Sequence, residues 1–341
     1  GVYAGYLAAG RLDLARGPIE RFFNLASQEN DAAYLCLAHR MIGIHAFYSG
    51  NLIVAGEHLR QALTLYDPAR HRDLAFRFGT DLGLSVRAFL AETELILGRP
   101  DQGRQIIKQA LDEARTLRHA MTLAQVYSAV NFYHAIVQDE SALRASSREA
   151  LAFSAEHRLV YHEDIGRVYA IYAEAPGLDI NRYLEDFRHA VDAIRASSPL
   201  GIPFYRALLA RRMLALGLTA VAAQEAEIAL EDIAHTGERW WEPELHIIRG
   251  QCFLALAHPN LPEAEQSFVR ALATARQMSA RTLELSAALH LAQLMQQQGK
   301  IREAHAALAP VLGHFAAEID TPALSEARAL LATLDERRRT L

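Results

Sequence analysis

Cysteine is scarce in this 341-residue chain, which contains only Cys36 and Cys252. Both lie in apolar stretches with helical spacing, and this argues against the disulfide framework of a secreted domain. Two buried, free thiols in a reducing cytoplasm are therefore the expected state. Long hydrophobic runs are also absent, and no stretch approaches the length of a membrane span. The sequence predicts a cytoplasmic protein that has no membrane partner.

An excess of charge of one sign is lacking as well. The chain carries 35 Lys and Arg against 40 Asp and Glu, for a formal net charge of −5, and the two signs are interleaved. This balance gives no general attraction to nucleic acid or to anionic lipid. We therefore expect no direct nucleic-acid partner for this chain.

The familiar catalytic motifs are missing too. The phosphate-binding pattern G-x-x-x-x-G-K-[ST] does not occur, nor does G-x-G-x-x-G or G-x-S-x-G. His162-Glu163 begins like a zinc-protease motif, but the second histidine at helical spacing is absent, so two imidazoles cannot converge on one metal. The sequence therefore predicts no catalytic residue, no metal site and no cofactor. On this basis we expect that the chain is not an enzyme.

What the chain does contain is an internal repeat. A turn glycine is followed by small and apolar residues at helical spacing, as from Gly50 through Ala55 and Leu59 to Ala62. The last residues of successive copies lie 40, 48, 40, 40, 39, 42 and 40 positions apart. These residues are Phe22, Ala62, Ala110, Ala150, Ala190, Ala229, Ala271 and Val311. A second apolar helix precedes each copy, and a period near 40 residues with two helices per unit is typical of a helical solenoid.

The repeat unit resembles the tetratricopeptide repeat (TPR). That family places small or apolar residues at fixed positions of its two helices, and two units of this chain match them well. The matching residues are Gly43, Ala55, Leu59 and Ala62, and then Cys252, Ala264, Phe268 and Ala271. The resemblance implies an all-α fold, a right-handed α-solenoid of TPR-like helix pairs with a period longer than the usual unit.

The chain reads as one superhelical domain over residues 1–341. Residues 1–30 form a truncated first repeat, because too few residues precede Gly10 for a full partner helix. Residues 31–322 form about seven helix pairs, and residues 323–341 form a C-terminal capping helix with a basic tail. A half-repeat exposes an apolar face unless something covers it, so we expect the native array to continue upstream.

The candidate binding residues come from positions that line the concave surface of TPR units. Arginine interleaved with aromatic residues there suits acidic or carboxylate-bearing peptides, although solenoid surfaces always carry some arginine. Trp241 is included because Trp240 and Trp241 point in different directions on a helix, so one can reach a groove; core packing is the favoured interpretation. The candidates outside the insertion are Arg40, Phe47, Tyr172, Arg211, Trp241, His246 and Arg249.

The one long step of the repeat contains an insertion at residues 66–79. It mixes basic and aromatic side chains and contributes the candidates Arg72, Phe76 and Arg77. A long segment between repeats often lies over the binding face of a solenoid. The preferred interpretation is plainer: an extension of a helix whose aromatic residues fill the core.

A second resemblance concerns the segments 65–72, 237–246 and 315–324. They are similar to the C-terminal region of large bacterial signalling proteins, in which an output domain precedes a signal-transduction ATPase and a TPR array closes the chain. The output domain of that family is a class III adenylate/guanylate cyclase or a winged-helix transcriptional regulator. The resemblance carries over no catalytic residues, and the loop at residues 200–204 departs from the family pattern.

The sequence thus supports two hypotheses of function. The first is a non-catalytic sensory or regulatory module that binds a protein, a peptide or a small-molecule effector; its partner would be the upstream ATPase domain of the same polypeptide. The second is a scaffold that holds partners or self-associates without sensing a ligand. Ligand-independent oligomerisation would favour the scaffold.

Overall fold

The computed structural model describes residues 2–174, 179–316, 319 and 321–340, and every regular element among them is helical. Residues 317, 318 and 320 of the segment 315–324 lie outside the described residues. The elements are α1 (Val2–Ala8), α2 (Leu12–Glu29), α3 (Ala32–Tyr48), α4 (Leu52–Leu65), α5 (Pro68–His71), η1 (Arg72–Leu74), α6 (Ala75–Phe78), α7 (Leu82–Ile96), α8 (Pro100–Leu117), α9 (Ala120–Ile136), α10 (Glu140–Glu156), α11 (Val160–Ala173), α12 (Ile180–Ser197), α13 (Ile202–Ala215), α14 (Thr219–Thr236), α15 (Glu242–Leu254), α16 (Leu261–Gln277), α17 (Arg281–Gln297), α18 (Ile301–Leu312) and α19 (Pro322–Thr340).

Consecutive helices pack as antiparallel pairs because small residues let their backbones approach. A methyl group added at Gly43 of α3 would lie 2.7 Å from Leu59 of α4, and one added at Gly250 of α15 would lie 2.5 Å from the ring of Phe268 in α16. The pairs are α3/α4, α7/α8, α9/α10, α11/α12, α13/α14, α15/α16 and α17/α18, and α19 packs on α18 and α17. The predicted all-α solenoid of helix pairs is confirmed.

The predicted anchors of the repeat fall in the second helix of each pair. All of them except Phe22, which is half-buried in α2, are buried in the contact with the preceding helix. Six of the eight anchors are alanine, so most of the second helices lie close to their partners and the spacing of the units is set there.

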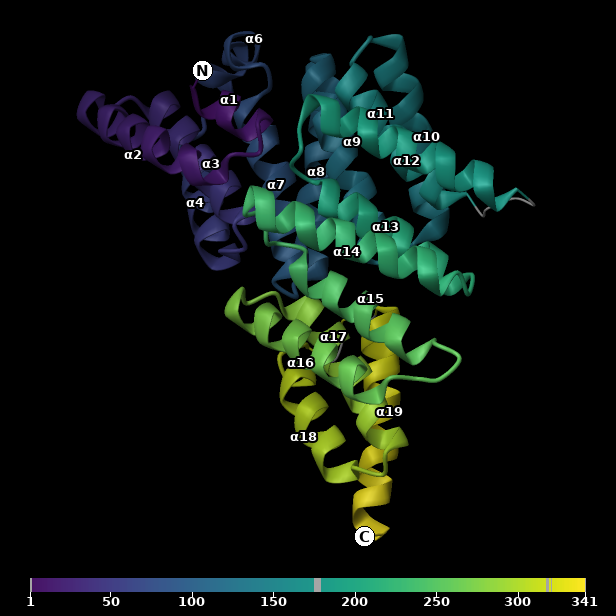
Figure 1. Cartoon of the computed structure of the whole chain (residues 1–341). Helices are drawn as coiled ribbons and strands as arrows, with labels where there is room; N and C mark the ends of the chain where they lie inside the picture. The colour runs from purple at the N-terminus through teal and green to yellow at the C-terminus, as the bar shows by residue number, and fades with distance from the viewer. Residues whose placement is uncertain (1, 175–178, 317–318, 320, 341) are drawn as a thin grey trace.

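The chain of pairs winds into a tight coil, which we call closed because units one turn apart touch, although the two chain ends lie at opposite ends of the molecule (Figure 1). Helices α1 to α4 lie on one side of the upper part and α9 to α12 on the other, while α15 to α19 lie below them. The backbone N–H of Arg239 donates to the carbonyl of Tyr48 at 2.8 Å, and Thr282 Oγ1 donates to the carbonyl of Leu95 at 2.5 Å. Units far apart in the sequence therefore touch, which does not happen in an open solenoid.

Aromatic side chains fill the middle of the coil. The ring centroid of Trp240 lies 4.8 Å from that of Phe47 and 5.4 Å from that of Phe204, and Trp241 packs 6.1 Å from Phe132. These residues are buried and come from units spread over most of the chain. Such ring contacts contribute about 0.5–1.5 kcal/mol each beyond their buried area.

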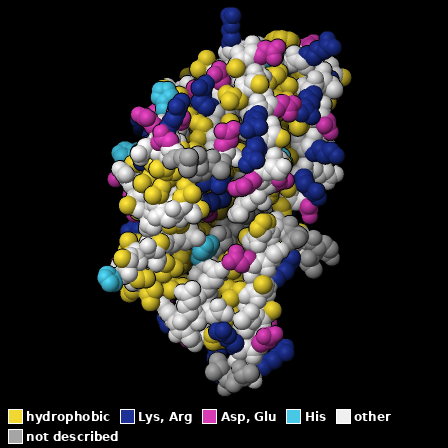
Figure 2. Space-filling model, turned by 90° about the vertical axis from the view of Figure 1, so that its right-hand side faces the viewer, with side chains coloured by type: hydrophobic (Ala, Val, Ile, Leu, Met, Phe, Trp, Pro, Cys, Tyr) yellow, Lys and Arg dark blue, Asp and Glu magenta, His cyan; other side chains and the backbone are white. Residues whose placement is uncertain are grey.

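The two cysteines are free and buried, as predicted. Burial raises the pKa of Cys36 to about 12 and that of Cys252 to about 11, so both stay protonated thiols. None of the helices that the structure describes combines the length and the apolar character that a membrane span requires. On the face shown in Figure 2, acidic and basic side chains are intermixed.

Candidate functional site

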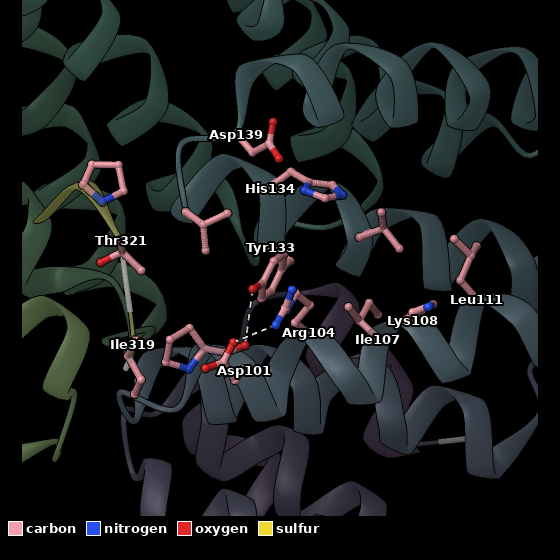
Figure 3. Close-up of a pocket in the computed structure, with 14 residues that line it drawn as sticks. Asp101, Arg104, Ile107, Lys108, Leu111, Tyr133, His134, Asp139, Ile319 and Thr321 are labelled. Carbon is pink, nitrogen blue, oxygen red and sulfur yellow. Dashed lines mark hydrogen bonds and ion pairs between the residues drawn. The ribbon is translucent and has the colours of Figure 1, made fainter. Parts of the chain in front are cut away.

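A large cleft lies between α8, α9 and the start of α19 (Figure 3). We call it the α8–α9 cleft; its volume is about 630 Å³. This is within the range of pockets that hold small molecules or short peptide segments. The lining residues are Pro100, Asp101, Arg104, Ile107, Lys108, Leu111, Val130, Tyr133, His134, Val137, Asp139, Ile319, Thr321 and Pro322.

The α8–α9 cleft has an apolar floor and a charged rim. Ile107 is buried, whereas Arg104 and Lys108 are exposed on the same helix. Arg104 donates to Asp101 at 3.0 Å, and the Tyr133 hydroxyl donates to the carbonyl of Pro100 at 3.3 Å. The ammonium group of Lys108 makes no ion pair in the part of the chain that the structure describes, which leaves it available to a carboxylate.

His134 connects the α8–α9 cleft to a second hollow, because it lines both. Burial lowers its pKa, against the opposing effect of the Asp139 carboxylate, so the imidazole is neutral near pH 7. Its Nδ1 atom is buried and has no hydrogen-bond partner among the described residues. Buried polar atoms are almost always hydrogen-bonded, so this atom is a candidate ligand contact.

The second hollow, the α11–α13 cleft, has a volume of about 310 Å³ and is lined by Tyr172, Arg211 and Arg212. The Arg212 guanidinium lies 4.9 Å from the centroid of the Tyr172 ring and donates to the Tyr172 carbonyl at 2.8 Å. Arg211 lies 2.8 Å from a carboxylate oxygen of Glu244. The Nε atoms of both arginines are buried and have no acceptor within the described ranges. Guanidinium donors without acceptors suit a carboxylate.

The structure brings some of the predicted site residues together and places others apart. Tyr172 and Arg211 come together in the α11–α13 cleft. Arg40 instead donates to Ser85 at 2.8 Å across two helices, and Arg249 lies 3.3 Å from Glu227 and 5.7 Å from the ring of Phe253. The role of Arg40 and Arg249 in binding a partner stays a prediction.

The structure does not place Phe47 and His246 on an open groove, because both are buried, and Trp241 packs in the core, as the favoured interpretation predicted. Trp241 and Phe47 belong to the aromatic centre of the coil, and each exposes only 1% of its surface. His246 is 2% exposed and lies 3.7 Å from Glu242 in the same helix. Because the coil is closed, the inner face of the first helices packs against other units and does not line an open groove.

The insertion at 66–79 forms three short helical turns, α5, η1 and α6. The preferred interpretation, aromatic side chains filling the core, is wrong for Phe76, which is 83% exposed. Arg77 lies 5.7 Å from the ring centroid of Tyr34 and lines a hollow of about 450 Å³. Arg72 pairs with Glu113 at 2.8 Å.

Sequence reasoning missed Arg104, Lys108, Tyr133, His134 and Arg212. The α8–α9 cleft is closed by Ile319, Thr321 and Pro322, about two hundred positions beyond α8, and no local spacing reports such a contact. A signal did exist for Arg212, which adjoins the predicted Arg211 in sequence.

Within the described ranges, no group of three or more His, Cys, Asp and Glu side chains is placed to hold a metal ion.

Comparison with known proteins does not identify a family for this chain. No protein-family model matches the chain, and no curated protein matches it. Among solved structures it is similar to yeast Tom70, with 13% sequence identity and a TM-score of 0.46. The match covers 95% of this chain and 59% of the Tom70 chain. At this level of similarity, the assignment of the fold rests on the helix pairs of the chain itself.

Proposed function

We propose that this chain is a non-catalytic protein-binding module, and that it binds an acidic peptide segment of its partner in the joined α8–α9 and α11–α13 clefts. The observation that carries this proposal is the set of basic groups along the two clefts. Lys108 makes no ion pair among the described residues, and Arg211 and Arg212 each have an Nε without an acceptor there, while their other nitrogens pair with Glu244 and Glu140. Carboxylates are the partners that such groups bind most strongly, through charge-assisted hydrogen bonds.

The apolar floor of the α8–α9 cleft indicates that the partner segment also contains apolar side chains. Ile107 and Val130 line the cleft between the charged groups, so an apolar side chain of the peptide can be buried there. Burial contributes about 25 cal/mol per Å² of apolar surface. The expected partner segment therefore alternates acidic and apolar residues.

The resemblance to signalling ATPases supports a place for this module in a larger protein. In the proposal, the acidic segment belongs to the ATPase domain upstream, and the module regulates a cyclase or a transcriptional output. A closed coil suits this role because it presents a fixed surface, and binding then costs little conformational entropy.

Fluorescence anisotropy with labelled acidic-apolar peptides tests the binding proposal. Lys108→Glu places a repelling charge in the α8–α9 cleft and should weaken binding by about tenfold or more. Arg16→Ala is the control, because Arg16 is an exposed arginine of α2 and should leave affinity unchanged. Equal binding of acidic and neutral peptides, or equal affinity of Lys108→Glu and the wild type, would contradict the proposal.

The alternative, a scaffold that self-associates, is favoured by one observation. Leu14 and Leu25 of α2 and Ile53 and Val54 of α4 are apolar side chains exposed at the same end of the coil. Sedimentation velocity distinguishes the two functions, since a scaffold would form concentration-dependent oligomers that Leu25→Glu abolishes.

A further inference from the structure

The centre of the coil holds a cavity that the proposed peptide site does not use. Its volume is about 130 Å³, and we call it the aromatic cavity. The first helices of five successive units, α3, α7, α9, α11 and α13, line it together with Trp240. Tyr48, Glu92 and Tyr161 in its wall are half-buried, so the cavity opens to solvent on one side.

Aromatic rings form most of the wall. Phe47 lies 5.7 Å from Phe89 and 4.8 Å from Trp240, measured between ring centroids. Tyr48 and Tyr161 add further rings from α3 and α11. The face of an aromatic ring attracts a cation within about 6 Å of its centroid, most strongly when water is excluded.

Two oxygen acceptors in the wall have no donor. Glu92 of α7 makes no hydrogen bond and no ion pair within the described ranges. The Oε1 atom of Gln125 in α9 is buried and also lacks a partner there. None of the residues that line the aromatic cavity is Lys or Arg, so the protein itself supplies no cation to Glu92.

We propose that the aromatic cavity binds a small organic ammonium ion. The N–H groups of the ligand donate to Glu92 and to Gln125 Oε1, and its alkyl body packs against the rings of Phe47, Phe89 and Trp240. This site is separate from the two surface clefts, so the proposal can be tested independently of peptide binding.

The volume limits the size of the ligand. An engineered protein cavity of about 150 Å³ holds one benzene molecule, so the aromatic cavity fits an ion of about five or six non-hydrogen atoms. Peptides and nucleotides are too large.

The charges around Glu92 agree with a cationic ligand. Burial raises the pKa of Glu92 to about 8, which leaves it largely protonated in the empty cavity at neutral pH. His162 lines the same cavity with its pKa lowered by burial to about 4, and burial raises the pKa of Tyr161 to about 12, so both are neutral. Burial likewise raises the pKa of Tyr48 and Tyr205. A bound ammonium ion favours ionised Glu92, so binding should release a proton.

Isothermal titration calorimetry of the whole chain near pH 7.5 tests the proposal with isobutylammonium. Isobutanol is the matched neutral probe, because it has the same shape and lacks the charge. We expect the ammonium ion to bind at least about tenfold more tightly than the alcohol, since it alone gains the ion pair. Titration in two buffers of different ionisation enthalpy should show the released proton.

Glu92→Gln should remove this preference and leave binding of the alcohol unchanged. Gln125→Leu is the second variant, and it should weaken ammonium binding several-fold even where Glu92→Gln folds poorly. Lys108→Glu, in the α8–α9 cleft, should have no effect. The proposal is overturned if neither probe binds at millimolar concentration, if both bind equally, or if the two cavity variants keep the preference for the ammonium ion.

Discussion

Carboxylates inside the coil differ in whether an arginine faces them. Glu225 of α14 lies 2.7 Å from Arg188 and 2.5 Å from Arg206, so its charge is compensated by two guanidinium groups. Glu92 has no such partner in the part of the chain that the structure describes. Ionisation of Glu92 in the empty cavity must therefore be opposed by its desolvation alone, and this opposes folding at high pH.

This difference predicts a pH dependence of stability. The pKa of Glu92 is about 8 in the folded protein and near its ordinary value of 4.5 in the unfolded chain. The folded state thus binds more protons between these values, and stability falls as the pH rises from 4.5 through 8. Glu92→Gln removes this loss. We expect it to raise the free energy of unfolding by on the order of 2 kcal/mol at about pH 8.5, allowing for partial solvation, and to change it little at about pH 5.

Thermal unfolding at the two pH values measures the effect. Glu303→Gln is the matched control, because Glu303 is exposed on α18 and should give no pH-dependent difference. Glu238 also lowers stability as the pH rises, because burial raises its pKa to about 7. The wild type and Glu92→Gln both contain Glu238, so its contribution cancels in the comparison. If the midpoints of wild type and Glu92→Gln differ by the same amount at both pH values, the assignment to Glu92 is wrong.

At the scale of the helix, close approach within a pair depends on glycine. A methyl group added at Gly103 of α8 would lie 2.9 Å from the carbonyl oxygen of Ala91 in α7, and backbone atoms have no room to yield. Gly103→Ala should therefore destabilise the protein by about 1–3 kcal/mol, the cost of overpacking.

Gly5→Ala is the matched substitution in an open position. Gly5 lies exposed inside α1, and an added methyl group would meet nothing within 4 Å. Alanine favours a helix interior over glycine by about 1 kcal/mol, so this variant should be neutral or more stable. Urea denaturation of both variants makes the comparison; equal effects would show that Gly103 is not a packing position.

The sequence predicted the second helix of each pair better than the first. Ala62, Ala150 and Ala229 were placed correctly, because a short local phrase that ends in a small residue determines which face packs. The inner faces of the first helices follow no such local rule. Phe47 was expected in a groove, but its ring contacts Trp240 of a distant unit, and the position of that unit depends on the curvature of the whole coil.

At the scale of the molecule, closure of the coil is the feature that local sequence could not predict. Helix α7 contacts α17, although more than a hundred residues separate them. A small rotation added at each helix pair decides whether units one turn apart touch, and no single residue specifies the sum. The same closure creates the aromatic cavity and completes the α8–α9 cleft. Neither site could therefore be predicted from the sequence of the individual repeats.

Closure can be tested with two glycines at the same position of the repeat. Gly98 and Gly299 each link the two helices of a pair and have φ angles of +85° and +77°. Alanine at either site costs about 1–2 kcal/mol for the left-handed backbone alone. Around Gly299 an added methyl group meets nothing within 4 Å, whereas at Gly98 it would lie 2.7 Å from Cβ of Arg281, where the coil closes. We expect Gly98→Ala to lower the free energy of unfolding by about 1–3 kcal/mol more than Gly299→Ala. Urea denaturation measures this excess. Equal losses would mean that the closing contact adds nothing to stability, and the coil would then unfold like an open solenoid, in which each unit depends only on its neighbours.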